Sequence, residues 1–257
     1  MRLRNIALGC ALTGSFGFLA LPQATARADS IVRAAAAKAT LTVTSKPQIS
    51  VTSPVTDNNY GTWVRLVVTL GPTFSDRQVS LYATPVGAAR SLVATGTVNA
   101  QGKWYLRYPI TRETTFTAVF AGDAYNAANS ATRTLQAYAR VADRITGFYK
   151  TSKSGSGITY RVFRGTGTLT LYSTVTPDKH GECLEPQTEQ YDKGAGWHAD
   201  TKYGCDTLDS ASHDTAPFSL SQAVGARYRI RGDYFRSAKD TANLDQQGPW
   251  IYFIVAK

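Results

Sequence analysis

The segment Phe116-Thr117-Ala118-Val119-Phe120-Ala121-Gly122-Asp123-Ala124-Tyr125-Asn126-Ala127-Ala128-Asn129-Ser130 decides how this chain folds. Positions 116, 118 and 120 alternate with 115, 117 and 119, and this period of two is typical of a half-buried β-strand. Gly122 and Asp123 follow at once and supply the turn chemistry that ends a strand. We therefore expect a strand, a Gly-Asp corner and a loop anchored by Tyr125.

Alternating segments of the same kind recur along the chain and are separated by Gly, Pro and Asn. Short strands at regular spacing, with no helix-period stretch of useful length between them, are typical of an all-β sandwich. One series runs over residues 40–140 and a second over 141–257. The prediction is all-β: two tandem antiparallel β-sandwiches. Weak sequence similarity between the two halves indicates repeated modules. In the second half, however, Phe235-Arg236-Ser237 occupies the place where a second Gly-Asp corner would lie.

The run Phe120-Ala121-Gly122-Asp123 with Tyr125 resembles the late-strand signature of bacterial Ig-like repeats, of the exported kind found in Gram-positive and actinobacterial proteins. The resemblance covers residues 40–140 and is weaker over 141–257. It implies two Ig-like sandwiches. It also implies a role as a spacer or as an adhesive or binding module on secreted and surface proteins. It implies no particular ligand.

Residues 1–28 have the layout of an export signal. Arg2 and Arg4 form a basic start, a weakly apolar stretch follows, and small residues allow cleavage after Ala26 or Ala28. Cleavage after Ala28 removes three arginines and no acid, which lowers the formal net charge from +10 to +7. The alternative is an uncleaved membrane anchor.

The dilution of the apolar stretch by Gly, Thr and Ser, and its end at Pro22, favour cleavage over anchoring. The Ala-rich residues 29–39 are expected to form a mobile lead. No other segment approaches the ~18 apolar residues that a spanning helix needs. We expect a secreted, extracellular protein without a membrane span, either released or held at the cell surface non-covalently.

Three cysteines occur, and Cys10 falls within the expected leader. Cys183 and Cys205 remain, and an isolated pair in an oxidising compartment is most simply a disulfide. A hairpin that turns at 194–196 would bring the two residues side by side. The loop is short enough for a stabilisation of about 3 kcal/mol. The alternative is two free buried thiols.

Arg227, Arg229 and Arg231 alternate along one predicted strand, so they should share a face. Such a stripe could bind a polyanion, and the expected compartment favours acidic cell-wall polymers or anionic glycans over nucleic acid. The alternative is a solvated face that keeps the protein soluble.

The three histidines, His180, His198 and His213, lie in polar, turn-like surroundings without metal-ligand spacing. We expect solvated loop histidines and neither a cofactor nor a metal ion. A secreted hydrolase, the least favoured hypothesis, would need these histidines to converge with carboxylates in a cleft.

Three acids, Glu182, Glu185 and Glu189, crowd one strand region, and paired carboxylates can hydrolyse glycosides. No motif supports that chemistry here. We expect surface salt bridges with neighbours such as Lys179 and Lys193 instead.

Each of the four tryptophans lies within or beside a predicted strand, where packing in the core is the default. The alternative is an exposed platform that stacks on sugar rings, as in a carbohydrate-binding module. The tryptophans are Trp63, Trp104, Trp197 and Trp250.

The last strand, residues 250–256, is apolar on both faces and is expected to be central or well covered. The alternative is an exposed edge that pairs with a partner's sheet. Together these features predict a non-enzymatic structural or interaction module that binds an acidic surface polymer or a protein partner.

Overall fold

A computed structural model of the chain describes residues 47–71, 77–221 and 223–256. The expected leader with Cys10, the lead over 29–39 and the first expected strand over 41–44 lie outside the described residues. The described residues form strands and no helix. Accordingly, they include no helix with the length and apolarity to cross a membrane. The predicted all-β class is confirmed.

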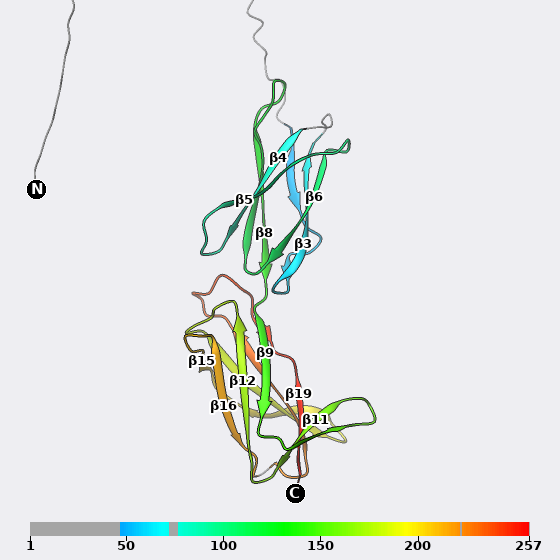
Figure 1. Cartoon of the computed structure of the whole chain (residues 1–257), viewed down its shortest axis with the longest axis vertical. Coiled ribbons are helices and arrows are strands. Elements are labelled where there is room, and N and C mark those ends of the chain that lie inside the picture. The colour runs from blue at the N-terminus through cyan, green and yellow to red at the C-terminus, as the bar shows by residue number, and fades with distance from the viewer. Residues whose placement is uncertain (1–46, 72–76, 222, 257) are drawn as a thin grey trace, which may run out of the picture. The chain divides into compact units, whose positions relative to one another are not determined.

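The first sandwich consists of a three-stranded sheet, β1-β3-β6, that faces a five-stranded sheet, β2-β8-β7-β4-β5 (Figure 1). Neighbouring strands are antiparallel except for β2 and β8, which are parallel. The strands are β1 (Ile49–Thr52), β2 (Asp57–Asn58), β3 (Thr62–Leu70), β4 (Gln78–Pro85), β5 (Ser91–Thr97), β6 (Lys103–Ile110), β7 (Thr114–Phe120) and β8 (Asn129–Ala137).

The second sandwich consists of the sheet β16-β12-β9 and a larger sheet, β10-β11-β19-β17-β13-β14, to which β15 and β18 add short pairings. The strands are β9 (Arg140–Thr146), β10 (Lys150–Lys153), β11 (Thr159–Arg164), β12 (Thr168–Thr176), β13 (Cys183–Asp192), β14 (Gly196–Lys202), β15 (Asp206–Thr207), β16 (His213–Ser219), β17 (Arg227–Phe235), β18 (Gln246–Gln247) and β19 (Ile251–Ala256).

The final strand β19 lies between β11, with which it is parallel, and β17, with which it is antiparallel. A central position covers both of its edges, and Phe253 and Val255 are buried in the core. The prediction of a central, covered strand is therefore confirmed, and the alternative of an exposed edge is excluded for β19.

Each sandwich buries apolar side chains from both of its sheets. In the first, Leu66 and Val68 of β3 pack in one cluster with Leu81 of β4 and Phe116 of β7. In the second, Leu171 of β12 belongs to one cluster with residues of β17 and β19. These shared cores, with the largely antiparallel sheets that form them, confirm the prediction of two tandem β-sandwiches.

The strand that opens the sequence argument is β7, and its burial alternates as predicted. Gly122 has φ of 90°, and an added Cβ would lie 3.0 Å from the Ala128 nitrogen, so the corner requires glycine. Asp123 Oδ1 accepts hydrogen bonds of 2.8 Å from the backbone N–H groups of Tyr125 and Asn126. The expectation that Tyr125 anchors the loop is wrong, because Tyr125 is 71% exposed whereas Asn126 is buried.

A similar corner follows β17, displaced toward the C-terminus from the expected place. Asp240 Oδ1 accepts a hydrogen bond of 2.9 Å from the N–H of Ala242, as Asp123 does from its loop. Asn243, three residues on, is buried and donates to the Thr111 and Ala137 carbonyls at 2.9 and 3.3 Å. The Asp-x-x-Asn spacing thus occurs once in each sandwich.

Cys183 and Cys205 form a disulfide with a Cα–Cα distance of 5.4 Å. β13 and β14 make the hairpin that turns near Gly194, and β15 returns to pair with Cys183 through Thr207. The bridge therefore lies at one end of a single sheet.

Candidate functional site

The predicted arginine stripe lies on the outer face of the larger sheet in the second sandwich. Along β17, Tyr228 and Ile230 are buried in the core, whereas Arg227, Arg229 and Arg231 alternate with them on the opposite face. The structure adds aromatic side chains from neighbouring strands, so that the stripe becomes a ladder. We call this set the arginine–aromatic ladder: Arg227, Arg229, Arg231, Tyr160, Tyr191, Trp197, Trp250 and Tyr252.

Arg229 forms the centre of the ladder. Its Nε and Nη2 atoms donate to Glu189 Oε2 at 2.7 and 2.5 Å, and the two residues are directly opposite in the β13–β17 register. The guanidinium also lies over the rings of Trp197, 4.9 Å from the centroid, and Trp250, at 4.4 Å. Ion pairing and two cation–π contacts fix this side chain and satisfy much of its charge.

Arg231 extends the same stack. Its Nε lies 2.8 Å from Asp233 Oδ1, and its guanidinium carbon lies 4.1 Å from the centroid of the Trp250 ring. Burial raises the pKa of Asp233 above its ordinary value, and the nearby Arg231 only partly opposes that rise. The pair is thus held inside the sheet surface rather than displayed to solvent.

Arg227 differs from the other two arginines. It is exposed, and its guanidinium lies 5.9 Å from the ring centroids of both Tyr160 and Tyr191. Among the described residues, no carboxylate lies within 4.0 Å of it. Of the three predicted polyanion-binding residues, Arg227 alone keeps an uncompensated charge, and the binding of a polyanion by this stripe stays a prediction.

The aromatic rings of the ladder contact one another at steep angles. Trp197 lies 5.3 Å from Tyr191 and 5.5 Å from Tyr252, with interplanar angles of 60° and 64°. The expectation that the tryptophans pack in the core is therefore wrong for Trp197 and Trp250. It is also wrong for Trp63, which is 63% exposed, while Trp104 packs against the first core as expected.

The structure gives the clustered acids other partners than the predicted Lys179 and Lys193. Glu189 pairs with Arg229, and Glu182 accepts hydrogen bonds of 2.6 and 2.9 Å from Ser237. Lys179 is buried rather than at the surface and pairs with Asp240 at 2.5 Å. Neighbourhood in sequence suggested the wrong partners, because strand pairing brings distant residues together.

The histidines His180, His198 and His213 are all exposed. Within the described ranges, no group of three or more His, Cys, Asp or Glu side chains could hold a metal ion. The convergence in a cleft that a hydrolase would need is thus not found at these three side chains.

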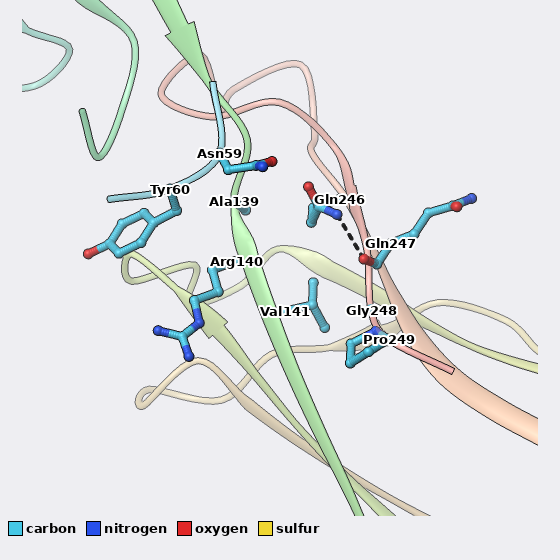
Figure 2. Close-up of a pocket in the computed structure, with 9 residues that line it drawn as sticks. All are labelled: Asn59, Tyr60, Ala139, Arg140, Val141, Gln246, Gln247, Gly248 and Pro249. Atoms are coloured by element: carbon cyan, nitrogen blue, oxygen red, sulfur yellow. Dashed lines mark hydrogen bonds between the residues drawn. The ribbon is translucent and has the colours of Figure 1, made fainter. Parts of the chain in front are cut away.

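An open hollow of about 390 Å³ lies beside the start of β9 (Figure 2). Its lining includes Tyr60, Arg140 and the segment Gln246–Pro249, in which the Gln246 amide donates to the Gln247 carbonyl at 2.8 Å. Figure 2 shows the Tyr60 and Arg140 side chains at its margin rather than converging on a point. Arg140 is the one charged residue among the described residues of the lining, and no nucleophile or acid faces it there. The hollow therefore suggests no catalytic reaction.

No family model and no curated protein matches this chain. Among solved structures, it is similar to a tetra-tandem repeat in the extending region of a large adhesion protein, with 16% identity and a TM-score of 0.36. That match covers 80% of this chain and 48% of the other, so the chain spans about half of that structure. A second similarity, to the D0-D1 domain of intimin, has 13% identity and a TM-score of 0.28 and covers 80% of this chain and 98% of the other.

Proposed function

We propose that this chain is a non-enzymatic interaction module of an exported bacterial protein, and that it binds a protein partner through the arginine–aromatic ladder. The observation that carries the proposal is the stack in which Trp197, Arg229, Trp250 and Arg231 follow one another along the outer face of the sheet. Trp, Tyr and Arg are the residues enriched in protein–protein interfaces and in their hot spots. Fixing them before binding reduces the entropy that association costs.

A protein partner fits this face better than a carbohydrate. Sugar rings stack on open, roughly coplanar aromatic faces, but here guanidinium groups lie over the rings of Trp197 and Trp250. The neighbouring rings also meet at steep angles, so that they do not form a flat platform. The alternative of a carbohydrate-binding module is therefore not favoured at the ladder.

The expected leader over residues 1–28 supports export, and the Cys183–Cys205 disulfide fits an oxidising compartment. Release into the medium, or retention at the cell surface, is part of the proposal. So does membership of the exported Ig-like repeat proteins, which the corner at Gly122 and Asp123 first indicated.

Site-specific photo-crosslinking tests the proposal. A photoreactive amino acid placed at Tyr191 or Arg227, both exposed, would report contacts of the ladder in extracts of surface proteins. Matched control positions are Thr215, on the other sheet of the same sandwich, and Tyr125, on the first sandwich; both are exposed.

We expect a discrete crosslinked protein from the two ladder positions that is absent at the control positions. Unmodified chain should compete it away, and Trp250→Ala should weaken that competition. Equal crosslinking from ladder and control positions, or competition untouched by Trp250→Ala in a folded variant, would refute binding by the ladder.

A further inference from the structure

We propose that the outer face of the β1-β3-β6 sheet binds a linear anionic polysaccharide. We call it the cationic face and define it by five exposed side chains: Trp63, Arg65, Lys103, Tyr105 and Arg107. The cationic face lies on the first sandwich and the ladder on the second. The two proposals can therefore be tested independently, and the failure of one does not affect the other.

The three strands of this sheet contain no Asp or Glu. Strand alternation buries Leu66 and Val68 and places the cations outward. Arg65 is directly opposite Arg107 in the β3–β6 register. Like charges directly opposite each other destabilise a sheet. A bound anion would remove that repulsion, which gives the face electrostatic complementarity to a polyanion.

The cations of this face are not neutralised from elsewhere in the part of the chain that the structure describes. No carboxylate there lies within 4.0 Å of Arg65, Lys103 or Arg107. In the ladder, by contrast, Arg229 and Arg231 both pair with acids. Positive charge that is free to bind an anion, which the sequence predicts for the ladder, is therefore found on the cationic face.

Two aromatic side chains accompany the cations. Trp63 is 63% exposed and Tyr105 is 45% exposed. The Arg65 guanidinium carbon lies 4.8 Å from the Tyr105 ring centroid, which orients the arginine along the surface. An exposed Trp leaves apolar area in water, and the C–H face of a sugar ring would cover that area.

The surface is also hollowed. An open groove of about 400 Å³ is lined by Thr52, Arg65, Thr69, Lys103 and Tyr105, among others. Ser53 also lines it, with a hydroxyl that is buried and has no hydrogen-bond partner among the described residues. Thr52 and Thr69, which are not buried, place hydroxyl groups beside the cations, which suits a ligand that carries both hydroxyl and acidic groups.

The length and the ring positions favour a polysaccharide over a nucleic acid. From Trp63 to Thr69, which faces Lys103 in the register, the strand rises about 20 Å, long enough for several sugar units. Single-stranded nucleic acids bind by stacking successive bases on open aromatic faces. On the cationic face, the Arg65 guanidinium lies over the ring of Tyr105. Trp63 is therefore the main ring left open, and a single open ring does not allow successive bases to stack.

Calorimetric titration of the mature chain tests the proposal with polygalacturonate as the anionic probe. Neutral dextran and a single-stranded oligonucleotide serve as comparison ligands. The test variant is Arg65→Gln/Lys103→Gln/Arg107→Gln. The matched control, Arg133→Gln/Lys150→Gln/Lys153→Gln, removes the same charge at exposed positions elsewhere. Circular dichroism and the denaturation midpoint verify that each variant is folded.

We expect polygalacturonate to bind the wild-type chain, more weakly at high salt, and dextran not to bind measurably. The test variant should lose about tenfold or more in affinity, and the control about twofold or less. Trp63→Ala should weaken binding at both salt concentrations. Absence of wild-type binding, equal losses in both triple variants, or tighter binding of the oligonucleotide would each overturn the proposal.

Discussion

The strongest energetic prediction concerns the buried ion pair between Lys179 and Asp240. The Lys179 Nζ lies 2.5 Å from Asp240 Oδ2, and the two side chains are only 3% and 8% exposed. Tyr234 also donates its hydroxyl to Asp240. Burial by itself raises the pKa of Asp240, but the hydrogen bonds from Lys179 and Tyr234 outweigh it, and the pKa lies below its ordinary value of 3.8.

Replacing Lys179 with Met removes the cation and leaves the carboxylate of Asp240 buried without its charge partner. Surface pairs contribute about 0–1 kcal/mol, whereas breaking a buried pair costs about 3–5 kcal/mol. The low exposure of both side chains selects the second range. We therefore expect Lys179→Met to lower the free energy of unfolding by about 3–5 kcal/mol.

Urea denaturation followed by circular dichroism measures this loss, with the slope of the transition expected to stay constant. Lys193→Met, at an exposed turn position, is the control and should change stability by less than about 0.5 kcal/mol. The double variant Lys179→Met/Asp240→Asn should be more stable than the single variant, because it leaves no unpaired charge. A loss below about 1 kcal/mol in Lys179→Met, or no recovery in the double variant, would refute this reasoning.

Three further predictions follow from single contacts. Because the pKa of Asp240 is lowered in the folded state, its contribution to stability is present above pH ~4 and is lost as the pH falls through the folded pKa. Asp240→Asn should therefore flatten this part of an acid titration followed by circular dichroism, and an unchanged slope would contradict the prediction. Gly96→Ala should cost about 1–3 kcal/mol and shift the emission of Trp104, since the new Cβ would lie 2.1 Å from that ring; unchanged emission and midpoint would count against it. Replacing Cys183 and Cys205 with Ala should lower the free energy of unfolding by about 3 kcal/mol in urea, because the bridge spans 22 residues; a midpoint equal to that of the oxidised wild type would exclude this.

The two proposed surfaces differ in physical character, and this difference separates their tests. On the ladder, Arg229 and Arg231 are stacked and ion-paired, so binding there should depend mainly on packing. On the cationic face, Arg65 and Arg107 lack carboxylate partners among the described residues, so binding there should weaken with added salt.

Sequence pattern alone determined the class and much of the local structure. The period of two along Phe116–Phe120 predicts the faces of β7 correctly, since side chains of a strand alternate whatever surrounds them. Gly122 and Asp123 predict the corner for a similarly local reason. The Cys183–Cys205 hairpin follows from proximity in the chain.

Only the tertiary structure decided which side chains meet across strands. Register places Glu189 against Arg229 and Arg65 against Arg107, and neither pair is close in the sequence. Burial of Lys179 depends on the loop after β17, some sixty residues away. Long-range pairing sets charge compensation, so a row of arginines in the sequence cannot show by itself whether its charge is free to bind a ligand.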